Sequence, residues 1–259
     1  MAPNFADSGS ITSRAIANKI IEAIGCKPPS GSISGQKAGR LFESVTKSFL
    51  KQAFGQLDHL RPGRWRYSTS QSIAEFDQYV HLSELEKIIE RSDELRAALG
   101  GDYIIQPDIV ISRDPVTDEE INQESLTIVD IADDYATSSP LRASNYQPSR
   151  PLLHASISCK WTVRSDRAQN TRTEALNLIR NRKGNLPHIV IVTAEPMPTR
   201  LASLALGTGD VDCVYHIALN ELQLALKTLN NEDQMDMLET LITGRRLRDI
   251  SDLPFDLAI

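Results

Sequence analysis

The chain has 259 residues, of which 41% are hydrophobic and 24% are charged, and its formal net charge at pH 7 is −6. This composition is ordinary for a globular protein, and no apolar run approaches the roughly 18–20 residues that a membrane-spanning helix needs. Residues 1–10 lack the layout of a signal peptide, and Cys26, Cys159 and Cys213 show no paired spacing. We therefore expect a cytoplasmic protein with free thiols and no membrane segment.

Helical patterns dominate the first part of the chain. They cover residues 11–24, 37–57 and 72–99, the last in two or three pieces, and a Pro/Gly/Ser-rich turn separates the first two. The helix predicted over 37–57 is strongly amphipathic. Its apolar stripe contains Phe42, Val45, Phe49, Ala53 and Leu57.

Strands and helices alternate in the remainder of the chain. Residues 103–111, 152–161, 188–193 and 211–216 are rich in β-branched residues, and helical patterns cover 167–182, 220–229 and 232–243. This order predicts an α/β fold with a mixed central β-sheet flanked by helices. Since there is no internal repeat and no low-complexity linker, we expect residues 1–259 to form a single domain.

Three residues form the minimal set of a metal-dependent nuclease. Asp108 interrupts an apolar strand, where a carboxylate is costly unless it is paired or binds a metal. Lys160 ends the next strand, and Glu174 follows on the next predicted helix. The acids would hold a divalent cation, and the lysine would orient the attacking water. The ordinary alternatives are a lysine at a strand edge and a surface glutamate paired with Arg167 or Arg172.

Ser158 stands at the position where this set usually has its second acid. On an extended strand Ser158 and Lys160 face the same side, so Glu174 would replace the missing carboxylate if its helix packs back over the strand. The main-chain oxygen of Cys159 is a candidate further ligand, because such oxygens suit Mg²⁺. Ser158 is a candidate catalytic position but not an expected nucleophile, since no histidine base lies near it in the sequence.

A cluster of charged residues after Lys160 suits the recognition of DNA. It consists of Arg164, Asp166 and Arg167, and we call it the reader cluster. In the major groove, arginine forks onto guanine and aspartate accepts from cytosine. The alternative is a helix start with Asp166 as its cap and two exposed arginines. From residue 160 to 183 there are seven basic residues and two acids, so the acidic total does not exclude nucleic acid. The eight acids of residues 114–134 are interpreted as a solvated loop.

Asp108, the tripeptide Ser158-Cys159-Lys160 and Glu174 together resemble the relocated-acid variant of the PD-(D/E)XK nucleases. The resemblance covers most of the chain and extends to a type II restriction endonuclease of this family. It is closest in four stretches, residues 151–167, 180–195, 205–216 and 248–253. It implies a restriction-endonuclease-like fold and matches Glu43 to a glutamate that helps to build the active site. The alternative for Glu43 is a surface pair with Lys47.

The resemblance also implies a recognition sequence. The reader cluster would recognise the central CCGG, Asp7 and Arg200 the outer G·C pair, and Gln36 the minor groove. The protein would then be a restriction–modification endonuclease that uses Mg²⁺, two ions per active site, to cut double-stranded GCCGGC after the first G. A homotetramer on two DNA copies is implied, and a palindromic site by itself requires at least a dimer.

Two other classes of function stay open. One is a PD-(D/E)XK nuclease or DNA-binding protein of the same fold with a different specificity, although an inactive relative should lack Asp108 or Lys160. The other is an enzyme that acts on small phosphorylated substrates. It has little support, because Gly207-Thr208-Gly209 is an isolated Gly-x-Gly motif. The five histidines show no ligand spacing, so a zinc site is not expected.

Overall fold

The fold was obtained as a computed structural model, which describes residues 3–26, 31, 33–99, 105–122, 126–130, 135–163, 165–207 and 209–259. The chain divides into two compact units. Unit 1 comprises Met1–Arg61, Ile157–Ile179 and His188–Ile259, and unit 2 comprises Pro62–Ser156 and Arg180–Pro187. Each unit is described by itself. The single domain expected over residues 1–259 stays a prediction.

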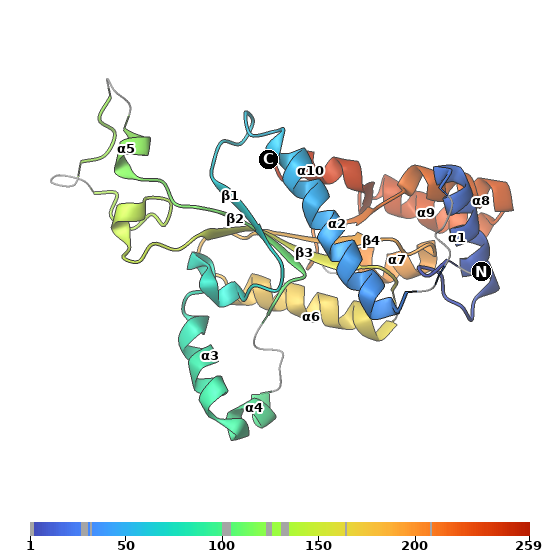
Figure 1. The fold of residues 1–259 in the computed structure, drawn as a ribbon, viewed down its shortest axis with the longest axis horizontal. Coiled ribbons are helices and arrows are strands. Elements are labelled where there is room, and N and C mark those ends of the chain that lie inside the picture. The colour runs from blue at the N-terminus through green and yellow to red at the C-terminus, as the bar shows by residue number, and fades with distance from the viewer. Residues whose placement is uncertain are drawn as a thin grey trace. The chain divides into compact units, whose positions relative to one another are not determined.

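The described residues contain a six-stranded mixed sheet (Figure 1), whose order follows the chain. Its strands are β1 (Trp65–Ser68), β2 (Ile109–Arg113), β3 (Leu152–Lys160), β4 (His188–Thr193), β5 (Cys213–His216) and β6 (Leu247–Asp249). In unit 2, β1 pairs antiparallel with β2. In unit 1, β4 pairs parallel with β5, and β5 pairs parallel with β6. The mixed α/β architecture predicted from the sequence is confirmed.

Both units also contain helices. Unit 1 contains α1 (Ile11–Ile24), α2 (Gly35–Gly55), α6 (Ser165–Asn181, its last residues outside the unit), α7 (Pro198–Ala205), α8 (Leu219–Leu229), α9 (Glu232–Thr243), the 3-10 turn η5 (Ile250–Asp252) and α10 (Leu253–Asp256). Unit 2 contains η1 (Ile73–Glu75), η2 (Asp77–Tyr79), α3 (Leu82–Arg91), α4 (Asp93–Leu99), α5 (Asp118–Ile121) and η4 (Ala143–Asn145). The predicted helices over 11–24 and 232–243 and the strand over 188–193 are confirmed with the same bounds.

The strand predicted over residues 103–111 begins later than expected. Residues 103 and 104 lie outside the described part of the chain, and β2 begins at Ile109. Pro107 has no main-chain N–H and restricts the residue before it, which explains why the ladder starts only beyond it. Asp108 therefore precedes the strand and is half-buried, instead of lying in the middle of the strand.

Helix α2 turns a different face to the core from the predicted one. Its buried residues repeat at every fourth position, and they are Ala38, Phe42, Thr46, Leu50 and Phe54. Val45 is 59% exposed. The sequence could not rank the two faces, because both carry apolar side chains at helical spacing. Val45 and Leu41 instead line an apolar groove of about 360 Å³ together with Ile33 and Trp161.

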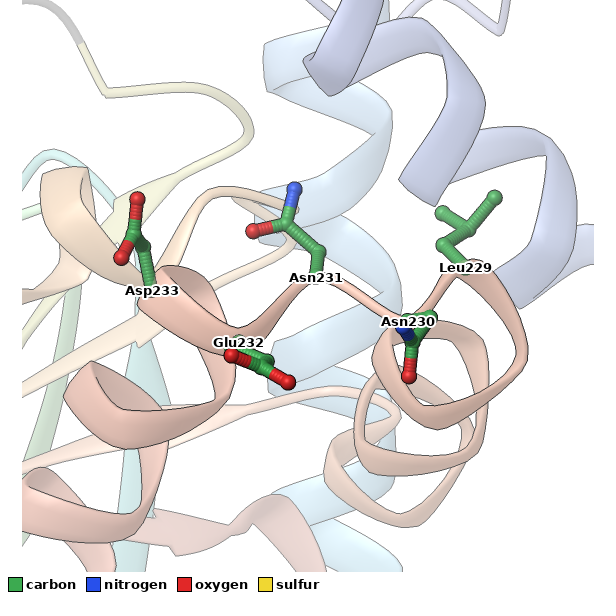
Figure 2. Close-up of a pocket in the computed structure, with 5 residues that line it drawn as sticks. All are labelled: Leu229, Asn230, Asn231, Glu232 and Asp233. Carbon is green, nitrogen blue, oxygen red and sulfur yellow. The ribbon is translucent and has the colours of Figure 1, made fainter.

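The turn from α8 to α9 shows how two asparagines separate two helices (Figure 2). Asn230 ends α8 in the left-handed conformation, with φ of 50°. The side chain of Asn231 accepts a hydrogen bond of 3.3 Å from the N–H of Gln234 and so caps α9. Asparagine tolerates the left-handed region and is among the preferred helix N-caps. Helix α8 packs against α1, and the two lie side by side in Figure 1.

The acidic segment of unit 2 is held by arginines. Asp118 accepts hydrogen bonds from two nitrogens of buried Arg142, at 2.6 and 2.9 Å. This contact lowers the pKa of the Asp118 carboxyl. Asp114 pairs with Arg66 at 2.7 Å. These two acids of the described segment are thus ion-paired, while residues 119–120 and 126–128 are exposed, as a solvated segment would be.

Candidate active site and nucleic-acid interface

The end of β3 carries two candidate residues on one side. Ile157 and Cys159 are buried, whereas Ser158 and Lys160 are half-buried, as the alternation of a strand requires. The same-side placement of Ser158 and Lys160 predicted from the sequence agrees with this pattern. Because the side chain of Cys159 is buried, the candidate ligand at this residue is its main-chain oxygen.

The ends of β3 and β4 lie together in unit 1. The carbonyl oxygen of Lys160 accepts a hydrogen bond of 2.7 Å from Thr193 Oγ1 and one of 3.3 Å from the N–H of Ala194. Thr193 is fully buried at the end of β4. The main chain at Lys160 is therefore fixed by the neighbouring strand, which limits where its side chain can reach.

Trp161 connects two other segments of unit 1 to the end of β3. Its ring contacts Phe5 edge-on, with centroids 5.7 Å apart, and Phe42 of α2 at 5.1 Å. Half-buried Glu43 follows Phe42 in α2, and exposed Gln36 lies at the beginning of this helix. Aromatic contacts of this kind stabilise a pair by about 0.5–1.5 kcal/mol beyond the area they bury. They hold α2 and the N-terminal segment beside the residue that follows Lys160.

The candidate metal ligands come from both units. Asp108 belongs to unit 2, whereas Cys159 and Glu174 belong to unit 1, where Glu174 is exposed on α6. Carboxylate and main-chain oxygens are hard donors of the kind that Mg²⁺ prefers. Among the described residues, no group of three or more His, Cys, Asp or Glu could hold a metal ion.

The structure describes only part of the reader cluster. Arg164 lies outside the described residues, and α6 begins at Ser165. Asp166 is consequently the second residue of the helix and not the cap before it, and Arg167 follows in the same turn. The predicted change from strand to helix at this point is confirmed, with a start two residues earlier than the expected residue 167.

Asp7 and Arg200, which we call the outer pair, form an ion pair between Oδ2 and Nη2. Arg200 lies in the first turn of α7, and Asp7 lies in the segment before α1. Asp7 Oδ1 also accepts the N–H of Gly9 at 2.9 Å, and the Asp7 N–H donates to Ser13 Oγ at 3.0 Å. The two side chains are 37% and 32% exposed, so they stay accessible to a ligand.

Glu195, a fully buried carboxylate just after β4, was not among the residues predicted from the sequence. Its Oε2 accepts the N–H of Val163 at 2.8 Å, and its Oε1 accepts the N–H of Met197 at 3.2 Å. Burial raises the pKa of the Glu195 carboxyl, and the hydrogen bond from Val163 and the charge of Arg200 oppose that shift. The available signal was an acid two residues after an apolar strand.

His216 is a buried imidazole that contacts the same segment. Its Nδ1 accepts the N–H of Ala218 at 3.1 Å, so its Nε2, 3.2 Å from the carbonyl oxygen of Glu195, carries the proton. Burial lowers the pKa of His216 from 6.5 to about 4. The folded state therefore keeps a neutral imidazole in a pH range where the unfolded state binds a proton.

This difference predicts a loss of stability as the pH falls from 6.5 towards 4, because protons then favour the unfolded chain. Between about pH 7.5 and about pH 5, the free energy of unfolding should fall by about 2 kcal/mol more in the wild type than in His216→Gln. Urea unfolding at both pH values measures the difference. An NMR signal assigned to the His216 imidazole that titrates near pH 6.5 in the folded protein would contradict the prediction.

Comparison with solved structures finds restriction endonucleases at low sequence identity. The type IIF restriction endonuclease Bse634I with cognate DNA has a TM-score of 0.40 and 13% identity, over 88% of this chain and 87% of that chain. A PspGI–substrate DNA complex has a TM-score of 0.33 and 16% identity, over 95% of this chain and 91% of that chain. No helix of the described residues is long and apolar enough to cross a membrane.

Comparison of sequences gives a much stronger match. The profile of the NgoMIV restriction enzyme family matches residues 1–259. The type II restriction enzyme NgoMIV of Neisseria gonorrhoeae is 50% identical over 259 residues, which cover 98% of this chain and 89% of that protein. The chain therefore belongs to the NgoMIV restriction enzyme family, with the restriction-endonuclease-like fold expected from its sequence, and it is a site-specific nuclease of the type II restriction class.

Proposed function

We propose that the protein makes Mg²⁺-dependent double-strand cuts at GCCGGC, after the first G. The observation that carries this proposal is the outer pair. Asp7 and Arg200 form an ion pair although 193 residues separate them, and neither stands out in the sequence. Arginine and aspartate are the side chains that suit guanine and cytosine edges, respectively. Arginine has five N–H donors, so Arg200 can bind Asp7 and still donate to a base.

The central CCGG is assigned to the reader cluster. Arg164 and Arg167 would fork onto guanines, and Asp166 would accept from a cytosine amino group. The start of α6 at this point supports the assignment, since residues in the first turn of a helix can enter the major groove together. Gln36, exposed at the beginning of α2, is assigned to the minor groove.

The chemistry is assigned to the two carboxylates and the lysine. Asp108 and Glu174 would hold Mg²⁺, two ions per active site, with the main-chain oxygen of Cys159 as a further ligand. A bound divalent ion lowers the pKa of the attacking water and neutralises charge on the leaving oxygen. The Lys160 ammonium orients that water and the scissile phosphate, and Glu43 holds the site from α2. Ser158, two residues before Lys160, occupies the position where this family usually has its second acid, and Glu174 takes over that acid's role.

A palindromic site is matched by a two-fold symmetric protein, so the active form contains at least two copies. We propose a homotetramer that engages two DNA copies in the cytoplasm. Sedimentation of the protein with and without a GCCGGC duplex measures the assembly. A monomer that cuts both strands in one binding event would contradict the proposed assembly.

Digestion of plasmid DNA, followed by sequencing of the fragment ends, tests the specificity. Cuts after the first G on both strands of GCCGGC leave 5′ extensions that read CCGG. Every fragment end should carry this extension, and a plasmid without the site should stay intact. Ends with a different consensus would support a nuclease of the same family with another specificity, and would refute GCCGGC.

A further inference from the structure

Glu195 lies between the two groups of residues assigned to base recognition, and this inference rests on the proposed function. On one side, its carboxylate accepts the N–H of Val163, which directly precedes the reader cluster. On the other side, it accepts the N–H of Met197, which directly precedes α7, and its Oε1 lies 4.0 Å from Arg200 Nη1. One buried carboxylate thus contacts the segments that carry both groups.

The same residue is tied to the end of β3. The N–H of Glu195 donates to Thr193 Oγ1 at 3.1 Å, and that hydroxyl donates to the carbonyl oxygen of Lys160 at 2.7 Å. The carbonyl oxygen of Glu195 lies 3.2 Å from Nε2 of buried His216. Both main-chain polar groups and both carboxylate oxygens of Glu195 therefore have partners, so its position is strongly determined.

A buried carboxylate needs a reason, because the loss of hydration makes it costly unless hydrogen bonds and charges compensate. Glu195 accepts from the buried N–H of Val163 and from the partly buried N–H of Met197, and a buried N–H group costs free energy when left unpaired. Arg200, which is already paired with Asp7, supplies a positive charge near the carboxylate.

We infer that Glu195 is a positioning residue that fixes the position of the reader cluster relative to the outer pair. The inner and the outer base pairs are then recognised together. Glu195 touches no base in this assignment. It acts through Val163 on the segment that leads into the reader cluster, and through Met197 and Arg200 on α7. Discrimination at the centre and at the ends of the site should therefore be lost together when Glu195 is changed.

Glu195→Gln is the test, because the glutamine has the same shape but only one side-chain oxygen. Its amide NH₂ group must face one of the two N–H donors, and it carries no charge for Arg200. Binding is measured in Ca²⁺ to four duplexes: GCCGGC, ACCGGT with a changed outer pair, GCATGC with a changed centre, and a scrambled sequence. The matched control is Glu239→Gln, at an exposed position of α9.

In Glu195→Gln, both the preference for GCCGGC over ACCGGT and that over GCATGC should fall about tenfold or more, with binding to the scrambled duplex unchanged. Arg200→Ala should lose only the preference at the outer pair. Normal preferences in Glu195→Gln would overturn the inference, and so would a loss confined to the outer pair. A wild type that binds GCCGGC no better than the scrambled duplex would instead overturn the proposed function, and the inference with it.

Hydrogen exchange in the wild type gives a second measurement, which does not depend on the folding of a variant. If one carboxylate holds both donors, the amides of Val163 and Met197 should be released by the same opening and exchange at closely similar slow rates. Rates that differ by more than about tenfold would show that the two segments open separately, and would overturn the inference.

Discussion

Asp108→Ala and Lys160→Ala are each expected to lower the rate of DNA cleavage by roughly 10²–10⁴-fold or more. Asp108 is the central metal ligand of the proposed site, and Lys160 orients the water and the phosphate. Neither belongs to the residues assigned to base recognition, so GCCGGC binding in Ca²⁺ should survive in at least one of the two variants. Single-turnover cleavage and competition binding measure the two effects separately.

Matched controls are available at exposed positions of unit 1. Asp58→Ala and Lys227→Ala remove the same kinds of side chain outside the proposed site and should cut normally. The wild type should stop cutting in EDTA and recover when Mg²⁺ is added. Normal cutting in EDTA, or by Asp108→Ala, would contradict the metal-dependent mechanism.

Glu174→Ala should be almost inactive, whereas Ser158→Ala should lose much less activity. Ser158 shares its side of β3 with Lys160 but offers only a hydroxyl, and the carboxylate that a metal needs is assigned to Glu174 on α6. Cleavage rates of the two variants at saturating Mg²⁺ measure the difference. Glu239→Ala, which removes an exposed glutamate of α9, is the matched control.

The reverse result would have a definite meaning. If Ser158→Ala is inactive and Glu174→Ala cuts normally, the acid has not been relocated to α6. The serine then takes part in the chemistry, and a nucleophilic mechanism that uses its hydroxyl has to be considered. A result of this kind would leave the family assignment unchanged, because that assignment rests on the whole chain.

Elements with strong local patterns could be predicted from the sequence. Helix α1 has a serine cap and a glycine stop, and β4 is an apolar run that is buried from Ile189 to Thr193, so both bounds were correct. The short strands β1 and β6 were missed, because three or four residues carry too little periodicity to stand out from a loop. Asp108 was predicted inside a strand but lies before it, because the strand begins only after Pro107.

The candidate site was predictable only where its residues are close in sequence. Lys160 and Ser158 share a side because a strand alternates, and that follows from spacing alone. Asp7 and Arg200 become partners only when the fold is complete, and no local pattern marks either of them. Glu195 follows an apolar strand, which is a local signal, but its importance lies in the N–H groups of Val163 and Met197 that it satisfies, and these contacts also form only in the complete fold.

The outer pair also has a consequence for the order of events during synthesis. Asp7 leaves the ribosome before its partner Arg200, which follows 193 residues later. At about 5–20 residues per second this interval lasts roughly 10–40 s. A chain that stops before α7 lacks Arg200, and one that stops before β4 also lacks the hydroxyl that fixes the end of β3. Under the proposed function, the residues assigned to the chemistry are therefore synthesised before Arg200, and recognition of the outer base pair is completed last.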